Sequence, residues 1–177
     1  MRAAVLGEKG AEIRDLPKPE PKPNEVLIRV RASSLNRADL LVASGHQHGS
    51  VGGLGARIGL ECSGEVEAVG SEVRDVKAGD RVMASAPGGF AEYVTTNAGR
   101  AHRIPGNNMS YEQAGCFPVA LQTMHNAVVT AGRLKRGETI AGRECQRGAL
   151  GHADWQVHGR IARDRHVDQS RAPGATP

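Results

Sequence analysis

Residues 59–70 read GLECSGEVEAVG and predict a strand with glycines at both ends. Within this stretch Gly64, Val66 and Ala68 alternate with two glutamates, which is the period of two expected of a half-buried strand. Glycine in such a strand allows a sharp bend or the close approach of a neighbouring backbone. We therefore expect this segment to lie inside a sheet, beside at least one other strand.

Other segments show the same kind of pattern. Residues 25–32 (EVLIRVRA) alternate cleanly, with Val26, Ile28, Val30 and Ala32 on one face and Leu27 with two arginines on the other. Shorter strands are predicted at residues 2–6, 11–16, 81–84 and 90–95, and four prolines make residues 17–23 an extended connector. Short strands with glycine at the corners predict a mainly β fold, a small barrel or sandwich, with short helices.

Helical signals begin at Ser110. Ser110 and Gln113 have the spacing of a capping box, and Pro118 is expected to begin a further helix. Gly132 is the expected residue after that helix. The apolar positions that follow helical spacing are Val119, Met124, Ala127, Val128 and Ala131.

Composition excludes several classes of function. The chain has 177 residues, a net charge of +4 and only 3% aromatic residues. It contains no basic run and few aromatic side chains that could stack on bases, which argues against a nucleic-acid-binding protein. No apolar run reaches the roughly 18 residues of a membrane helix. Cys62, Cys116 and Cys145 form no Cys-x-x-Cys pair, which indicates reduced thiols and a cytoplasmic protein.

Residues 1–140 resemble the GroES-like catalytic domain at the N-terminus of medium-chain dehydrogenases/reductases, and most closely the zinc-independent quinone oxidoreductase branch. The resemblance rests on motifs that occur in the same order as in that family. They are PKPNEVLI (21–28), SLNRADL (34–40), GLECSGEV (59–66), VKAGDRV (76–82), GFAEYV (89–94) and AGCFPVALQT (114–123). The implied fold is a partly open β-barrel, from which the nucleotide-binding Rossmann domain of the family is missing.

The resemblance argues against a zinc site. Zinc-dependent relatives place a Cys, and then a His followed by Glu, at two of these motifs, and catalytic zinc takes three protein ligands. Here Asn36 stands at the Cys position and Leu60 at the His position, so that only Glu61 remains. The pair His46 and His48 lies in a glycine-rich loop without a third ligand in view, and we expect it to be solvated.

The resemblance further implies hydride transfer from NADPH to a quinone or an activated C=C or C=O acceptor. The residues that contact the nicotinamide side in relatives correspond to Asn36 and Thr123. An amide and a hydroxyl suit this role because they form hydrogen bonds without adding charge. The alternative is structural: Asn36 closes a turn with Asp39, and Thr123 caps or bonds back to its own helix. In the loop after Asp39, Leu41, His46 and Gln47 stand where relatives often carry a tyrosine, so the residue that donates a proton to the substrate stays open.

Residue 140 marks a change in the sequence. We expect a GroES-like domain over 1–132, the start of the first Rossmann strand over 133–140, and an aberrant, disordered tail over 141–177. The tail contains no G-x-G-x-x-G. When the codons of the tail are read one base later, they permit the strand, glycine turn and helix that the family has here. The codons of Trp155 and Gln156 then force a glycine, in agreement with the family. The codons of Ala149 and Leu150 cannot encode the glycine that the family has at that position. We therefore favour a frameshift over an evolved basic interaction arm.

These observations predict a chain with little or no activity by itself, from an NADPH-dependent, zinc-independent oxidoreductase lineage. Two alternatives stay open. One is a stand-alone binding or interaction domain without catalysis, and the other is an enoyl reductase or zinc-free alcohol dehydrogenase relative. The uncovered helix face around Met124 and Val128 is expected to promote aggregation or a homodimer.

Overall fold

The computed structural model describes residues 1–47, 52–106, 108–136 and 138. It divides the chain into two units, Met1–Met124 and His125–Pro177. All the sheets described below, and the candidate site, belong to the first unit. The domain boundaries expected from the sequence stay predictions.

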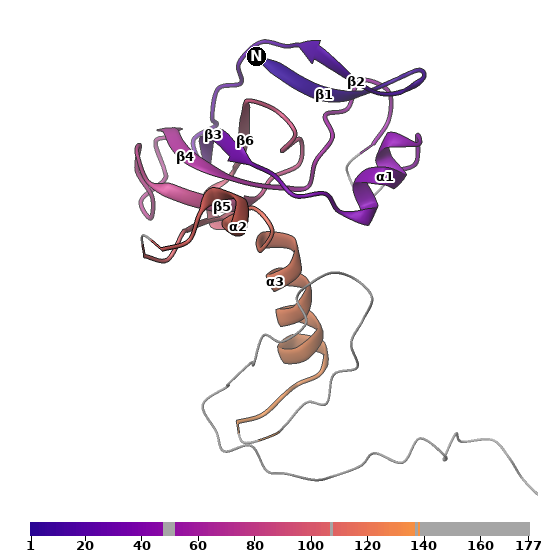
Figure 1. The fold of residues 1–177 in the computed structure, drawn as a ribbon. Coiled ribbons are helices and arrows are strands. Elements are labelled where there is room, and N and C mark those ends of the chain that lie inside the picture. Colours follow the sequence, from indigo (N-terminus) through magenta and orange to yellow (C-terminus); the bar gives the residue numbers. More distant parts are fainter. Residues whose placement is uncertain (48–51, 107, 137, 139–177) are drawn as a thin grey trace, which may run out of the picture. The chain divides into compact units, whose positions relative to one another are not determined.

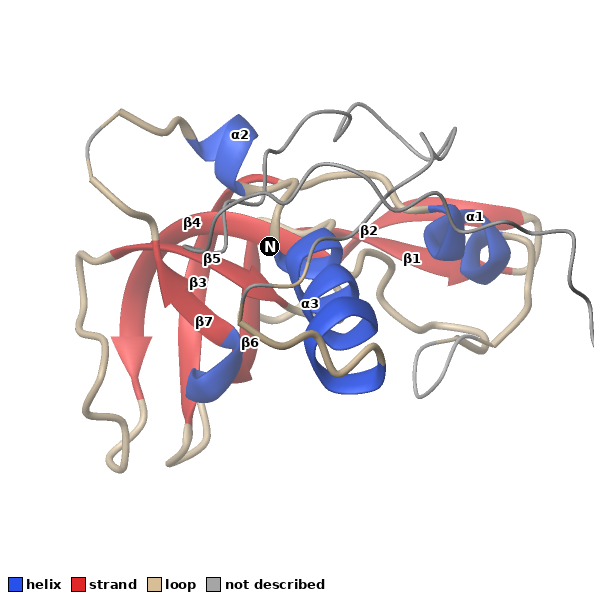
Figure 2. Cartoon of the chain, turned by 90° about the horizontal axis from the view of Figure 1, so that it is seen from below, coloured by secondary structure: helices blue, strands red, loops and turns tan. Residues whose placement is uncertain are grey.

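Two antiparallel sheets form the first unit (Figures 1 and 2). The smaller one pairs β1 (Arg2–Gly7) with β2 (Gly10–Asp15). The larger one has the strand order β6-β3-β4-β5-β7 and comprises β3 (Glu25–Ala32), β4 (Glu61–Val69), β5 (Arg81–Ser85), β6 (Tyr93–Asn97) and β7 (Ala101–Arg103). The sheets stay open, which confirms the predicted mainly β, GroES-like architecture.

The segment before β6 differs from the prediction. A strand was expected over residues 90–95, but β6 begins only at Tyr93. Ala91 forms a bridge with Ala3, and the N–H of Ala4 donates to the carbonyl of Phe90 at 2.8 Å. Residues 90–92 thus bond to β1 before the chain joins the larger sheet, which is why the regular strand begins later.

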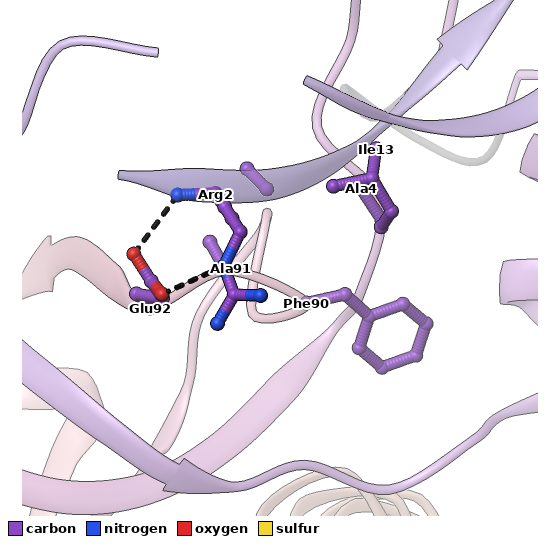
Figure 3. A pocket seen from close by; sticks show the side chains of 7 residues that line it. Arg2, Ala4, Ile13, Phe90, Ala91 and Glu92 are labelled. Atoms are coloured by element: carbon purple, nitrogen blue, oxygen red, sulfur yellow. Dashed lines mark hydrogen bonds and ion pairs between the residues drawn. The ribbon is translucent and has the colours of Figure 1, made fainter. Parts of the chain in front are cut away.

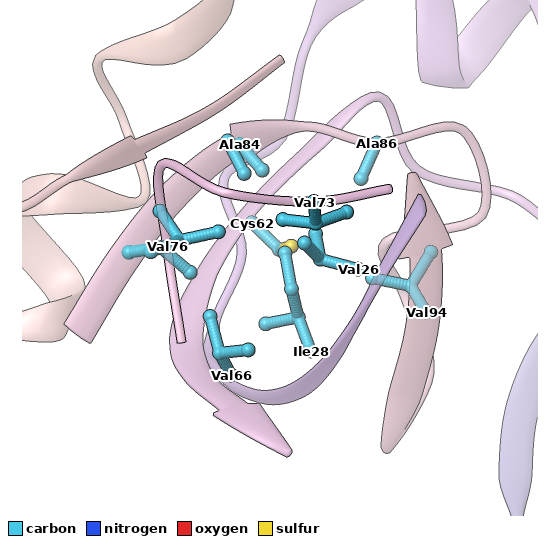
Figure 4. Close-up of a cluster of buried hydrophobic side chains, with 11 residues drawn as sticks. Val26, Ile28, Cys62, Val66, Val73, Val76, Ala84, Ala86 and Val94 are labelled. Carbon is cyan, nitrogen blue, oxygen red and sulfur yellow. The ribbon is translucent and has the colours of Figure 1, made fainter. Parts of the chain in front are cut away.

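The core lies on one face of the larger sheet (Figure 4). Figure 4 shows the side chains of β3, β4 and β5 meeting those of the loop between β4 and β5. Its buried members are Val26, Ile28, Cys62, Val66, Val73, Val76, Val82, Ala84, Ala86, Val94 and Ala101. These residues are aliphatic or small, in keeping with the low aromatic content of the chain.

Leu27 corrects the expectation that only one face of β3 is buried. It was placed on the exposed face but is only 4% exposed. β3 is an interior strand between β4 and β6, and its register against β4 shifts between Leu27 and Ile28. The residue skipped at this shift is Glu67 on β4, so β3 itself keeps its period of two. Leu27 therefore lies on the face opposite Val26 and Ile28, and both faces of β3 are buried at this point.

Short helices complete the described chain: α1 (Arg37–Ala43), the 3₁₀ turn η1 (Ala98–Arg100), α2 (Tyr111–Ala114), α3 (Pro118–His125) and the π-helix η2 (Asn126–Ala131). The predicted capping box is confirmed, because the N–H of Gln113 donates to the Ser110 hydroxyl at 3.2 Å and the Gln113 side chain accepts from the Ser110 N–H at 3.0 Å. Pro118 begins α3 as predicted. None of the described helices is long and apolar enough to cross a membrane.

The end of the helical region departs from the expected pattern. The predicted single α-helix becomes a π-helix from Asn126 onward. Gly132 follows the last helical residue, Ala131, as predicted. Its φ is −73°, and the next residue, Arg133, has a positive φ of 50°. The predicted strand at Thr139–Ile140 and the tail lie outside the described residues.

Candidate functional site

The loop between β3 and α1 contains the first predicted site residue, Asn36. It is the N-cap of α1, with extended backbone angles (φ −107°, ψ 153°). Its N–H donates to Oδ2 of Asp39 at 2.7 Å, which is one bond of a capping box. The turn with Asp39 considered in the sequence is therefore present, and it holds the backbone of Asn36 in place.

Glu61, the first residue of β4, lies at the centre of the site. Its side chain is only 1% exposed, yet both carboxylate oxygens are used. Oε1 accepts from Nδ2 of Asn36 at 2.8 Å and also from the Ser34 hydroxyl. Oε2 accepts from the N–H of Val119 at 2.7 Å. Three donors around one buried carboxylate compensate for the loss of water, as a buried charge requires.

The bond to Val119 connects Glu61 to the beginning of α3. Pro118 is the first residue of this helix and has no N–H, and the N–H of Val119 would otherwise be one of the helix's unpaired donors. A carboxylate at this end is favourable because the helix dipole is positive there. Thr123 follows Val119 by four residues, so it lies one turn further along on the same face of α3.

The two predicted cofactor-binding residues are thus joined by a short path. Asn36 bonds to Glu61, Glu61 bonds to the first turn of α3, and the exposed Thr123 lies on the next turn. The connecting role of Glu61 was not predicted, because the sequence identified Glu61 only as the one remaining candidate ligand of a zinc site. Ser34 and Val119 carry no chemical motif that would have identified them.

Asp39 is a second buried carboxylate beside Asn36. It is 3% exposed, and among the described residues no hydrogen-bond partner is found for its Oδ1. Burial raises the pKa of Asp39, the bond from the Asn36 N–H opposes this, and the negative charge of Glu61 adds to the rise. Asn36 therefore lies between two carboxylates, one holding its backbone and the other its side-chain amide.

Cys62 follows Glu61 along β4 and points into the core. It is fully buried, and burial, assisted by the charge of Glu61, raises its pKa to about 12. A thiol with such a pKa stays protonated and is a poor nucleophile. Cys62 is thus a packing residue and takes no part in the chemistry of the site.

Gly59 allows the backbone before β4 to lie close to the backbone of Phe90. Its φ of +106° is rare for residues with a side chain, and a Cβ there would lie 2.5 Å from the backbone nitrogen of Phe90. The Ser33 hydroxyl also donates to the carbonyl of Gly89 at 2.8 Å. Residues 89 and 90 are thereby packed against the start of β4, where Glu61 stands.

The donor atoms of the site do not form a metal-binding set. At the positions where zinc-dependent relatives are expected to have a Cys and a His, the structure has the Asn36 amide and the Leu60 side chain. Among the described residues no group of three or more His, Cys, Asp or Glu side chains is arranged to hold a metal ion. His48 of the pair considered in the sequence lies outside those residues.

A separate hollow lies between β1 and residues 90–92 (Figure 3). Its volume is about 290 Å³, and an ion pair of 3.0 Å between Arg2 and Glu92 forms part of its wall. It is lined by Arg2, Ala3, Ala4, Ile13, Phe90, Ala91 and Glu92, and includes neither Asn36 nor Thr123. The candidate site is the hydrogen-bonded cluster around Glu61, not this hollow.

Comparison with known proteins gives a consistent family. Residues 22–106 match the family model "Alcohol dehydrogenase GroES-like domain". A highly reducing polyketide synthase of Alternaria alternata is 36% identical over 126 residues, which are 71% of this chain and 5% of the synthase. The human synaptic vesicle membrane protein VAT-1 homolog-like protein has a structure with 35% identity and a TM-score of 0.70, covering 77% of this chain and 45% of that one.

Enzyme structures match at similar levels. A mycobacterial quinone oxidoreductase is 32% identical with a TM-score of 0.66, and CurK enoyl reductase is 26% identical with a TM-score of 0.69. A mycobacterial protein solved in complex with NADPH is 31% identical with a TM-score of 0.65. Each comparison covers 77% of this chain and 42–45% of the other, so the chain spans less than half the length of these relatives.

Proposed function

Because the described part of this chain is a GroES-like domain of the medium-chain dehydrogenase/reductase superfamily, we propose that it serves in hydride transfer from NADPH to a quinone or an enone-type acceptor. A nicotinamide cofactor is supported by the relatives, which include a protein solved with NADPH and an NAD-dependent alcohol dehydrogenase. The acceptor is supported by the quinone oxidoreductase and enoyl reductase among them.

The observation that carries this proposal is the shared carboxylate of Glu61. Asn36 and the first turn of α3 come from distant parts of the sequence, and Glu61 bonds to both, at 2.8 and 2.7 Å. A site that holds an amide and a helix bearing an exposed hydroxyl in fixed positions suits a ligand with several polar groups, such as the nicotinamide and its ribose.

NADPH would supply the hydride, and this chain's residues would bind and orient its nicotinamide end. Asn36 and Thr123 would form hydrogen bonds with the carboxamide and the ribose. The pyrophosphate of such cofactors is normally bound at a glycine-rich turn and helix N-terminus. The sequence over 141–177 has no such motif, so we propose that residues 1–177 bind NADPH weakly and turn over slowly or not at all.

We propose that the reaction proceeds without zinc. The support is the chemistry of the side chains: at the two relevant motifs the chain offers one amide, one leucine and one carboxylate. All the polar atoms that Glu61 could offer to a metal are already bonded to Ser34, Asn36 and Val119. A catalytic zinc needs three protein ligands and an open position.

The test uses fragments of the cofactor on the full 1–177 chain. Reduced nicotinamide mononucleotide, which has only the nicotinamide half, should shift the NMR signals of Asn36 and Thr123, whereas 2′-phospho-AMP, a fragment of the adenosine half, should leave them unchanged. Oxidation of NADPH by a quinone should stay below about one turnover per second, the lower end for intact enzymes. Failure of the mononucleotide to shift these signals contradicts a nicotinamide site here.

Two alternatives are separated by the acceptor and by the binding experiment, respectively. An enoyl reductase relative would bind the mononucleotide but accept an enoyl thioester in place of a quinone when joined to a nucleotide-binding domain. A stand-alone binding domain would bind a small molecule or a protein saturably while ignoring both cofactor fragments. A cytoplasmic location and a homodimer stay predictions from the sequence.

A further inference from the structure

Glu61 has a role that the family resemblance does not assign to it. We propose that Glu61 is the positioning residue of the site: it sets the orientation of the Asn36 amide and its placement relative to the first turn of α3. The proposal rests on the proposed function, because it concerns how the nicotinamide-binding groups are held together.

The first argument is the direction of the hydrogen bonds. An ionised carboxylate only accepts, and Nδ2 is the only donor of the Asn36 side chain. The 2.8 Å bond to Oε1 of Glu61 therefore decides which end of the amide faces which way. An amide held by a neutral side chain could rotate by half a turn and exchange its oxygen for its nitrogen; the Glu61 carboxylate prevents this.

The second argument is that both carboxylate oxygens are needed at once. Oε1 bonds to the loop after β3, and Oε2 bonds to the N–H of Val119 at 2.7 Å. The side chain that joins them is 1% exposed, so water does not compete for either bond. A change at Glu61 must therefore alter the loop and the helix together, although they are not neighbours in the sequence.

The third argument comes from comparing glutamate with glutamine. Glu61 meets donors only, from Ser34, Asn36 and Val119. Glutamine has the same shape but one of its two terminal atoms is a donor. Whichever way it turns, an NH₂ group faces either the Val119 N–H or the two donors on the other side, and that contact becomes repulsive. Glu61→Gln is thus a minimal change that should break the contact on one side and, because the charge is lost, weaken the bond on the other side.

The experiment measures NMR spectra of the full 1–177 chain with and without reduced nicotinamide mononucleotide. In Glu61→Gln we expect the Asn36 side-chain signals to move, the Val119 amide to exchange faster with solvent, and the dissociation constant to rise about tenfold or more, the effect of losing a hydrogen bond to a charged group. Glu67→Gln is the matched control, since Glu67 is an exposed carboxylate on the same strand that pairs with Lys18. It should leave all three quantities unchanged.

The outcomes separate this proposal from the proposed function. If wild-type chain binds the mononucleotide and Glu61→Gln binds it within about twofold, Glu61 does not position the site, and the proposed function stands. If the wild-type chain does not bind the mononucleotide at all, both the proposed function and the proposed role of Glu61 are wrong. If Glu61→Gln does not fold, Ser34→Ala removes only one donor from the same carboxylate. We expect it to move the Asn36 signals and weaken binding about threefold, and unchanged signals and affinity overturn the proposal.

Discussion

Nδ2 of Asn36 donates to Oε1 of Glu61 at 2.8 Å, across 25 positions of sequence. This bond joins a helix-capping residue to a carboxylate that is buried at the start of a central strand. It also means that Asn36 has two roles in one place, as the N-cap of α1 and as a partner of Glu61. The structural and the functional interpretation of this residue therefore do not exclude each other.

Asn36→Asp should destabilise the chain strongly. The substitution keeps the shape but places a third carboxylate against Glu61 and Asp39, both of which are buried. We expect a loss of about 3 kcal/mol in the free energy of unfolding at pH 7, because an uncompensated charge in a buried site costs this much. The loss should shrink in acid, where carboxyl groups become neutral. Urea unfolding at both pH values measures it.

The control for that change is Asn97→Asp. Asn97 caps η1 with Oδ1, which accepts from the N–H of Gly99 at 2.9 Å, and aspartate would accept equally well. We expect its unfolding free energy to stay within about 0.5 kcal/mol of wild type. Equal stability of Asn36→Asp and Asn97→Asp would show that the cluster around Glu61 tolerates a further negative charge, and would contradict the prediction.

Asp39 should make the stability of the chain depend on pH. Its pKa is raised above the usual 3.8, chiefly by burial, so the folded state binds this proton more tightly than the unfolded state. Stability therefore falls as pH rises from 3.8 through the raised pKa. Asparagine at position 39 cannot bind this proton. We therefore expect the free energy of unfolding of Asp39→Asn to rise relative to that of wild type as the pH increases through that range.

Asp80 gives the opposite sign and serves as the comparison. Its pKa is lowered, first by the hydrogen bond from the Lys77 side chain and then by the Lys77 N–H. The ionised Asp80 stabilises the fold above pH 3.8, and this stabilisation is lost as the pH falls through the lowered pKa. Asp80→Asn should therefore be less stable than wild type at neutral pH and equally stable in acid. Parallel slopes for the two variants would contradict the assignment for Asp39.

Cys62 should resist alkylation in the folded chain. With a pKa of about 12, only about one in ten thousand of its thiols is ionised at pH 8, and the side chain is fully buried. Cys116 is exposed and should react at the ordinary rate. Peptide mapping after treatment with iodoacetamide measures both. Labelling of Cys62 at the rate of Cys116, without denaturant, would show that β4 opens readily.

Gly64→Ala should disturb the pairing of the two central strands. A Cβ at Gly64 would lie 2.1 Å from the carbonyl oxygen of Arg29 on β3, and backbone there cannot move aside cheaply. We expect a loss of about 3 kcal/mol or more in unfolding free energy. Gly79→Ala is the control: its φ is +87° but nothing lies within 4 Å, so only backbone strain of about 1 kcal/mol should appear. Similar losses for the two would refute the close strand contact.

The nucleotide sequence through codons 135–177 and about 600 bases beyond tests the frameshift, since a nucleotide-binding domain needs well over one hundred residues. We expect one added or lost base to restore a glycine-rich turn and a Rossmann domain. A confirmed reading frame with no such domain in any frame would mean that the tail is native. The binding-domain alternative would then become the better explanation of the chain.

Local patterns were enough to predict much of the fold. The strands expected at residues 25–32 and within 59–70, the capping box at Ser110 and the helix start at Pro118 all appear in the structure. Each depends on residues within a few positions of one another, because strand period and helix caps are properties of short segments. Where the prediction was wrong, the reason lay outside the local segment: Leu27 is buried in an interior strand, residues 90–92 bond to β1, and the helix changes to a π-helix at Asn126.

The candidate site was different in kind. The sequence pointed to Asn36 and Thr123 through a resemblance, but nothing local relates them to each other. Glu61 joins them through bonds that span 25 and 58 positions, to Asn36 and to Val119. Contacts over such distances arise only when the sheet forms and brings β3, β4 and α3 together, because no repeating pattern of side chains encodes them. The partners of the Glu61 carboxylate were therefore decided by tertiary packing alone.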